Sequence, residues 1–145
     1  MSSLISRDMK RFNYLLGEMD AAYHEISLKL GMSDSAMIIL YTICDIGDCC
    51  LLTEICRLSG LSKQTVNSAL RKLEAQGTLY LEKAGPKGKK VCLTEAGKTL
   101  AERTALRLLR TEDAILASWP RQDVEKYLDL TERFLNALRK EAEKL

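Results

Sequence analysis

The sequence predicts a mainly α-helical protein with one small β-hairpin. Apolar residues recur at helical spacing over most of the 145 residues, one short stretch alternates apolar and polar residues, and glycines separate the periodic segments. With 46% hydrophobic and 29% charged residues, the composition is that of one compact soluble domain. The longest apolar run, residues 36–44, falls well short of the roughly 20 residues of a membrane-spanning helix, so we expect no membrane partner.

The first half of the chain contains four predicted helices. Residues 7–30 form a long helix whose apolar positions follow in steps of three and four, and Gly31 ends it. A second helix, capped by Ser33 or Asp34, runs to about residue 46, and residues 52–58 form a short third one. A fourth begins after the N-cap candidate Ser62 and ends near residue 76, with Gly77 in the left-handed C-terminal position.

The second half begins with the hairpin and continues in helices. Residues 78–84 and 90–93 alternate as strands do, and the glycine-rich, basic segment 85–89 connects them. Cys49 and Cys50, beside Gly47 and Asp48, are expected in a loop. Thr94 caps a fifth helix that continues to about residue 118, and Trp119-Pro120 separates it from a sixth.

Positive charge is concentrated in the centre of the chain. Residues 51–98 hold nine basic and four acidic residues, a net charge of +5, whereas the whole chain carries +2. The two flanks together are therefore mildly acidic. A basic centre points to a polyanionic partner, and double-stranded DNA is the first one to test.

The fourth helix carries a face suited to a DNA major groove. Its apolar positions face inward, and the outer positions are short hydrogen-bonding or basic side chains with no acid before Glu74. Amides can bond adenine, arginine can bond guanine in a forked geometry, and hydroxyl groups can hold phosphates. The candidate DNA contacts on this helix are Ser62, Lys63, Gln64, Thr65, Asn67, Ser68 and Arg71, and those on the hairpin are Lys87, Lys89 and Lys90.

These segments resemble the MarR-type winged helix-turn-helix regulators of bacteria. The likeness rests on Leu-Ser-Lys-Gln-Thr-Val-Asn at the start of the fourth helix, Leu-Glu-Ala-Gln-Gly at its end, and Leu-Thr-Glu-Ala-Gly before the fifth helix. It implies a winged-helix fold and an obligate homodimer that binds a pseudo-palindromic operator. It also implies a ligand-responsive transcription factor, most often a repressor. The chain lacks the Asp-Arg-Arg run common in family wings, so we expect its lysine-rich wing to hold phosphates rather than read the minor groove.

Domain organisation follows the same pattern. We expect one winged-helix regulator domain over residues 1–145, with a DNA-binding lobe at about 34–93. Two dimerisation segments, at about 6–30 and 94–145, flank it. The last helix repeats apolar residues in steps of four and three, from Val124 through Leu128 and Leu135 to Leu145. A symmetric pairing of two chains would bury these stripes, so we expect a homodimer.

What the protein senses is left open by the sequence. Family effectors bind where the dimer helices meet the DNA-binding lobe, which here implies a pocket at Tyr23, Met37, Tyr41 and Cys44. Cys49 and Cys50 are candidate thiol sensors for an oxidant, whereas Cys44 and Cys56, which fall on apolar helix faces, are better explained as small core residues. We expect reduced thiols, because five cysteines cannot all pair and no C-x-x-C spacing occurs. His24, the single histidine, does not make a metal site, and no cofactor is expected.

Other function classes find little support. The sequence contains no phosphate-binding glycine loop and no recognisable catalytic triad, so we expect no enzyme. The N-terminus lacks the pattern of a signal peptide, and we expect a cytoplasmic protein. The alternative function is a winged-helix protein-interaction module without DNA binding, which salt dependence of binding would distinguish.

Overall fold

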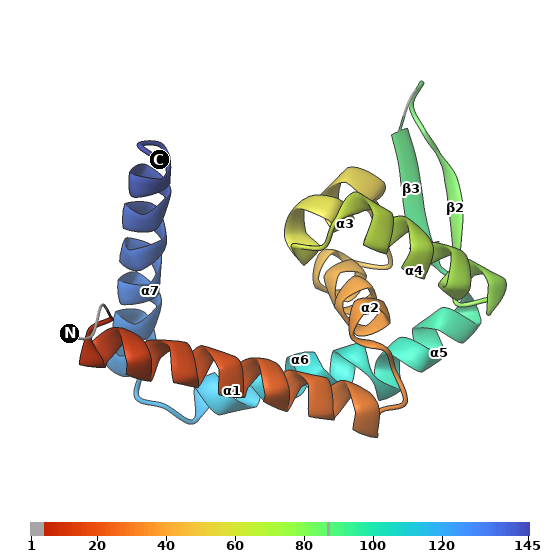
Figure 1. Cartoon of the computed structure of the whole chain (residues 1–145). Helices are drawn as coiled ribbons and strands as arrows, with labels where there is room; N and C mark the ends of the chain where they lie inside the picture. Colours follow the sequence, from red (N-terminus) through yellow and green to blue (C-terminus); the bar gives the residue numbers. More distant parts are fainter. Residues whose placement is uncertain (1–4, 87) are drawn as a thin grey trace. The chain divides into compact units, whose positions relative to one another are not determined.

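A computed structural model describes residues 5–86 and 88–145. The elements run in the order α1 (Arg7–Lys29), α2 (Asp34–Ile46), β1 (Cys49–Leu51), α3 (Leu52–Ser59), α4 (Lys63–Ala75), β2 (Leu79–Ala84), β3 (Gly88–Leu93), α5 (Glu95–Arg103), α6 (Ala105–Ala117) and α7 (Arg121–Ala142) (Figure 1). They form two compact units, one up to Arg107 and one from Leu108 to Leu145. The mainly helical fold class with a small β wing is confirmed.

The first unit is built around α2, which supplies the most deeply buried side chains. Ile39, Leu40 and Ile43 are fully buried, and α2 contacts α3, α4 and β1. Helix α4 adds Val66, Leu70 and Leu73 to this core, as its predicted inward stripe requires. This apolar packing fixes α4 along one flank and leaves its other flank exposed.

A tight turn joins α3 to α4 and sets up the helix-turn-helix. Gly60 has φ +72°, a left-handed conformation that glycine adopts without a Cβ clash, and Gly77 has φ +77° just after α4. The predicted N-cap Ser62 is confirmed, because its Oγ accepts a hydrogen bond from the Thr65 amide at 3.1 Å. Both ends of α4 are therefore defined by local chemistry that the sequence shows.

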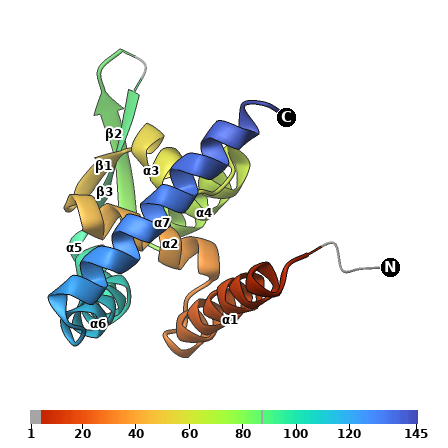
Figure 2. The same cartoon turned by 90° about the vertical axis from the view of Figure 1, so that its left-hand side faces the viewer.

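The sheet has three antiparallel strands in the order β1-β3-β2 (Figure 2). In the hairpin, Leu79 pairs with Leu93 and Ala84 with Gly88, so β3 begins two residues earlier than the sequence predicts. The core-facing side chains Leu79, Val91 and Leu93 are buried. The outer face carries alternate residues, as the pleat of a strand dictates.

Strand β1 corrects the prediction that Cys49 and Cys50 lie in a loop. Residues 49–51 pair with residues 90–92 of β3. Three residues are too few to show an alternating pattern, and the strand exists only because a partner distant in sequence provides its hydrogen bonds. Local sequence signals therefore did not reveal it.

The predicted fifth helix is in fact two helices, α5 and α6, separated at Thr104. Thr104 has φ −123° and ψ −91°, outside helical values. Its hydroxyl donates to the Leu100 carbonyl at 2.8 Å, and its amide bonds the Ala101 carbonyl three residues back. A buried threonine that bonds to the preceding turn bends or interrupts a helix, which explains the break.

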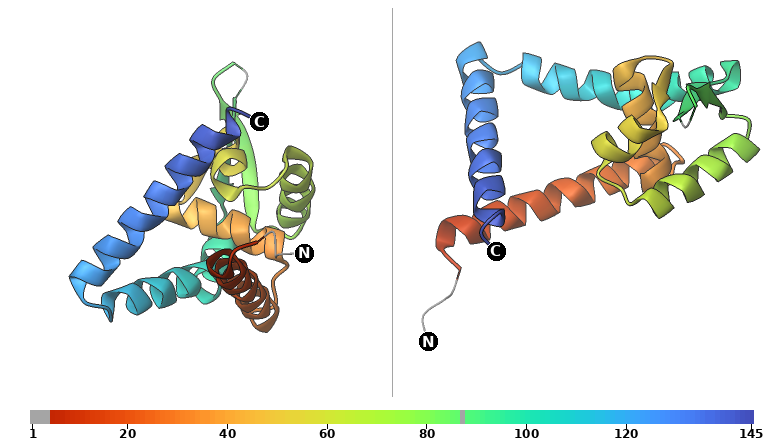
Figure 3. Two further views of the ribbon diagram at one scale, coloured as in Figure 1. Left: turned by 60° about the vertical axis from the view of Figure 1, so that its left-hand side comes forward. Right: turned by 90° about the horizontal axis from the view of Figure 1, so that it is seen from above.

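The second unit holds the rest of α6 and the whole of α7. The predicted division at Trp119-Pro120 is confirmed, and Pro120 precedes the first residue of α7. The ring of Trp119 meets that of Tyr127 edge to face, with centroids 5.6 Å apart. Figure 3 shows the turn at which α7 leaves α6.

Candidate nucleic-acid interface

The outward flank of α4 is a polar surface that begins at a well-capped N-terminus. The Ser62 hydroxyl bonds the Thr65 hydroxyl at 2.8 Å in addition to capping the helix. Ser62, Lys63, Gln64, Thr65, Ser68 and Arg71 are exposed, and Asn67 is half-buried. These are all seven of the helix residues predicted as DNA contacts, and the structure places six of them on α4 and Ser62 at its N-cap.

A surface depression follows this flank. It has a volume of about 550 Å³ and is lined by Lys63, Gln64, Asn67, Ser68 and Arg71. The lining therefore combines two amides, a hydroxyl and two cations, and it contains no carboxylate. Such groups can donate to phosphate oxygens and to the exposed base edges of a major groove.

The wing extends from the same lobe. Lys89 lies at its exposed edge, and half-buried Lys90 pairs with Glu82 across the hairpin at 3.7 Å. The third predicted wing contact, Lys87, lies outside the described residues. Lys83 and Lys89 are cross-strand partners near the tip. Like charges directly opposite each other repel, so a bound anion would be favoured at this part of the wing.

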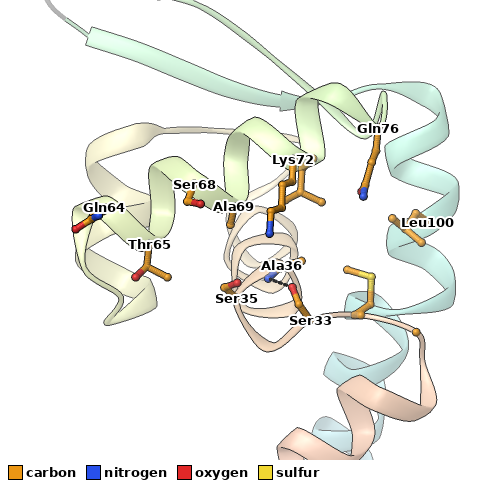
Figure 4. A pocket seen from close by; sticks show the side chains of 13 residues that line it. Ser33, Ser35, Ala36, Gln64, Thr65, Ser68, Ala69, Lys72, Gln76 and Leu100 are labelled. Carbon is orange, nitrogen blue, oxygen red and sulfur yellow. Dashed lines mark hydrogen bonds between the residues drawn. The ribbon is translucent and has the colours of Figure 1, made fainter.

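A second pocket adjoins the first along α4 and was not predicted from the sequence. It measures about 530 Å³ and lies between α4, the first turn of α2 and α5. Figure 4 shows the Lys72 side chain extending from α4 toward the first turn of α2, where the Ser33 Oγ accepts from the Ala36 amide. Gln64 and Ser68 line both hollows, so the pocket extends the polar surface of α4. Lys72 follows Ser68 by one helical turn, and that spacing is the sequence signal for it.

The residues implied as an effector pocket are spread over two helices. Tyr23 lies on α1 and is 44% exposed, whereas Met37 on α2 is 3% exposed and belongs to the core. Tyr41 and Cys44 are half-buried on α2. None of the four lines the pocket beside Lys72. Their role as an effector site stays a prediction.

Two of the five cysteines are joined, which overturns the expectation that all thiols are reduced. Cys49 in β1 and Cys92 in β3 form a disulfide, with Cα atoms 4.1 Å apart. Sequence spacing did not reveal the pair because 43 positions separate the two residues. Only the pairing of β1 with β3, itself unpredicted, brings them together.

Two of the three remaining thiols, Cys44 and Cys50, lie in surroundings that disfavour the reactive thiolate. Burial raises the pKa of Cys50 from 9.0 to about 11, and the negative charge of Glu54 adds to this. Burial also raises the pKa of Cys44 to about 11, helped by Asp48 and Glu102. Cys50 is therefore a weak nucleophile at neutral pH, which argues against the thiol-sensor role suggested for it.

The single histidine joins α1 to the start of α2. His24 Nδ1 lies 2.7 Å from the Asp34 carboxylate, and both side chains are more than half exposed. Over residues 5–86 and 88–145, no three histidine, cysteine or acidic side chains gather as metal ligands. In the same part of the chain, no single helix has the length and apolar content to cross a bilayer. The pair α1 and α2 meets that test together but bends by 90° between them.

Large apolar side chains remain exposed along α1 and α7. On α1 they include Met9, Leu16 and Met19, between 37% and 44% exposed, and on α7 Leu128, Leu135 and Leu138, between 41% and 56%. These are the stripes that the sequence predicts as dimerisation faces. Contiguous exposed apolar rows of this kind mark surfaces that bind another protein.

Comparison with known proteins supports the same fold over nearly the whole chain. A model of the MarR family matches residues 30–90. A MarR family regulator from Neisseria meningitidis superposes with a TM-score of 0.83 at 16% identity, over 96% of this chain and 99% of that one. MepR of S. aureus, solved as a DNA complex, gives 0.69 at 18% identity over 92% and 98%.

A ligand-bound relative shows the same architecture. PcaV of Streptomyces coelicolor, in complex with its natural ligand, gives a TM-score of 0.68 at 15% identity over 95% of this chain and 99% of that one. No curated protein matches the chain in sequence. The resemblance to MarR-type winged-helix regulators is thus confirmed, by the family model for residues 30–90 and by the fold beyond them.

Proposed function

Since residues 30–90 match the MarR family and the fold is that of MarR-type regulators, we propose that this protein is a sequence-specific, DNA-binding transcriptional repressor. It acts in the cytoplasm as a homodimer on a pseudo-palindromic operator and catalyses no reaction. The observation that carries the proposal is the outer flank of α4, which has no acid before Glu74, with its depression lined by Gln64, Asn67 and Arg71.

The shape and chemistry of this flank support major-groove binding. An α-helix fits the major groove of B-DNA, where each base pair presents a distinct pattern of donors and acceptors. Asn67 and Gln64 suit adenine, and Arg71 suits guanine. Ser62 and Thr65, at the N-terminus of α4, suit phosphate oxygens, because backbone amides and the helix dipole favour an anion there.

The exposed apolar rows of α1 and α7 support assembly with a second copy. A dimer with twofold symmetry presents two α4 helices, and helices of this kind enter successive major grooves about 10 base pairs apart. Each wing then reaches the phosphates beside its own half-site. Lys89 and Lys90 supply salt-sensitive affinity there, without reading bases.

An effector would act by changing the position or rigidity of the DNA-binding lobe. NadR, a similar structure, was solved in complex with 4-hydroxyphenylacetate, and PcaV with its natural ligand. For this chain we propose a small-molecule site near Tyr23, Met37, Tyr41 and Cys44. Tyr23 and Tyr41 lie on α1 and α2, the two helices that the His24–Asp34 pair also joins.

Selection of binding sites from a random DNA duplex pool tests the proposal. The native protein should enrich an inverted repeat with half-sites about one helical turn apart. The Asn67→Ala, Arg71→Ala double variant should lose that enrichment, while a matched Asn136→Ala, Arg139→Ala variant of α7 keeps it. The selection is run with the chain fully reduced and again after mild oxidation.

Three results would count against the proposal. Failure to enrich any sequence in both redox states would favour the protein-interaction module instead. Enrichment that the Asn67→Ala, Arg71→Ala variant retains would move the reading surface away from α4. Binding to a protein partner that persists as salt rises would also favour the interaction module, because phosphate contacts weaken steeply with salt.

A further inference from the structure

The disulfide between Cys49 and Cys92 occupies a particular position in the sheet. The two residues are direct partners across β1 and β3. The neighbouring pair, Asp48 and Leu93, is hydrogen-bonded, with the Leu93 amide donating to the Asp48 carbonyl at 2.9 Å. Cys49 and Cys92 therefore form a non-hydrogen-bonded pair, the class in which side chains approach most closely. Their Sγ atoms can join without any change in strand pairing.

The two cysteines of the disulfide differ in solvent exposure. Cys92 is 1% exposed, whereas Cys49 is half-buried at the edge strand. On the same face of the sheet, the Glu82 carboxylate lies 3.8 Å from the Cys92 Sγ and 3.7 Å from the Lys90 ammonium. A solvent-borne reagent reaches Cys49 first, and Cys92 has a carboxylate beside it to accept its proton.

The disulfide also closes a loop that contains the whole candidate DNA interface. Residues 50–91 include α3, α4 and β2, and every predicted DNA contact lies between Ser62 and Lys90. β1 leads directly into α3, and β3 carries Lys89 and Lys90. This one bond is therefore a covalent link between the strand that leads into the helix-turn-helix and the strand that carries the wing lysines.

We propose that Cys49 and Cys92 are a reversible dithiol–disulfide site that couples the redox state of the cell to DNA binding. The proposal rests on the proposed function, because disulfides that form in a reducing cytoplasm are usually transient and redox-sensing rather than structural. The oxidant is a peroxide, and the reductant is a cellular dithiol. In the oxidised form the wing is held against the helix-turn-helix and the affinity for DNA is higher.

The chemistry balances in two steps. The Cys49 thiolate attacks one peroxide oxygen, so that an S–O bond forms, the O–O bond breaks, and the leaving hydroxide takes a proton to become water. The Cys92 sulfur then attacks the Cys49 Sγ, and its proton passes by way of the Glu82 carboxylate to the hydroxide that leaves Cys49. The S–S bond forms, the S–O bond breaks, and the leaving group departs as a second water. A dithiol reductant returns two electrons and two protons and becomes a disulfide itself.

Thiol mapping of the intact protein tests the redox site. The reduced chain is treated with hydrogen peroxide, alkylated and digested, and a peptide linked through Cys49 and Cys92 is expected, which a dithiol then releases. Cys49→Ser and Cys92→Ser should each abolish the link, whereas Cys56→Ser leaves it intact. A protein that forms no link, pairs other cysteines, or keeps the link under a dithiol excess without denaturant would overturn the proposal.

DNA affinity of the two forms tests the coupling. The oxidised native chain should bind the selected operator at least about fivefold more tightly than the reduced chain. A fivefold change in affinity is at the lower end of the coupling usually found between two sites. Cys92→Ser should bind like the reduced form under both conditions, and its circular dichroism shows whether it folds. Equal affinities of the two native forms would overturn the coupling. A reversible link in a chain that binds no DNA in either form would instead defeat the proposed function and leave the redox chemistry standing.

Discussion

Gly97, in the first turn of α5, lies directly against the backbone carbonyl of Thr78, the residue before β2. A Cβ on Gly97 would fall 1.8 Å from the Thr78 oxygen, closer than any real contact. The Gly97 amide donates to the Thr94 Oγ at 2.9 Å, and the Thr94 hydroxyl in turn bonds the Thr78 carbonyl at 3.1 Å. This close approach joins the end of the wing sheet to the helix that follows it.

Replacing Gly97 with alanine should therefore destabilise the protein. Alanine is the better helix former by about 1 kcal/mol, yet the clash is with backbone and cannot be relieved by a rotamer change. We expect a net loss of about 1 to 3 kcal/mol in the free energy of unfolding, as for other overpacked sites. Urea denaturation measures it. Gly17→Ala in α1, where the Cβ meets nothing within 4 Å, should instead gain about 0.5 to 1 kcal/mol.

The thiols of Cys50 and Cys44 should react quickly with alkylating reagents only at high pH. Since the folded pKa of Cys50 and of Cys44 is about 11, only about 1% of each is thiolate at pH 9, against half of an ordinary thiol with a pKa of 9.0. Iodoacetamide should label both slowly at pH 9 and much faster as the pH approaches 11. Mass spectrometry of peptides reads this out, and denatured protein is the control. Fast labelling of native Cys50 at pH 8 would contradict its assignment as an inert core thiol.

The same shift makes the fold sensitive to alkali. A thiol whose pKa is raised by folding stabilises the native state fully below its unfolded pKa, near 9. That contribution is lost as the pH rises from about 9 toward 11, because the unfolded chain ionises first. The free energy of unfolding should fall over this window, and Cys50→Ala should flatten the fall.

Substitution of Arg71 and substitution of Lys89 should weaken DNA binding in different ways. If Arg71 bonds a guanine edge, Arg71→Ala should cost about 1 to 3 kcal/mol on the operator and much less on random DNA. Fluorescence anisotropy on both duplexes measures the two losses. Equal losses would assign Arg71 to phosphate binding alone.

The wing lysine should affect the salt dependence rather than the sequence preference. Lys89→Gln should weaken binding to every duplex and reduce the slope of log K against log salt by about 0.9, the value for one lost phosphate contact. Lys144→Gln, two residues beyond the end of α7, is the matched charge control and should leave the slope unchanged. A changed sequence preference in Lys89→Gln would show that the wing reads bases after all.

The parts of the fold that local chemistry determines could be predicted from the sequence. Ser33, Ser62 and Thr94 cap their helices as expected, and the inward stripe of α4 follows from the spacing of Val66, Leu70 and Leu73. The exposed outer flank of α4 follows from that stripe, because the face of an amphipathic helix opposite its buried residues lies in solvent. The candidate site could be located for this reason.

What could not be predicted depends on contacts between distant residues. β1 exists through its pairing with β3, and the Cys49–Cys92 bond exists through β1. The pocket beside Lys72 requires α2, α4 and α5 to meet, and the break at Thr104 depends on a buried hydroxyl that bonds the preceding turn. None of these features produces a periodic pattern in the sequence. Hydrophobic periodicity and secondary-structure propensity therefore do not indicate them.

The dimer should depend on the apolar row of α7. Leu128 and Leu135 are 49% and 41% exposed and lie two helical turns apart on the face that also carries Leu138. Leu128→Asp with Leu135→Asp would place two carboxylates in the proposed interface, where burial without partners costs several kcal/mol. We expect the double variant to sediment as a monomer and to lose operator binding, since each monomer holds a single α4. Asn136→Asp adds a negative charge to the polar face of the same helix and should remain a dimer. A double variant that still sediments as a dimer would move the interface to α1 alone, and Leu16→Asp with Met19→Asp would then have to dissociate it.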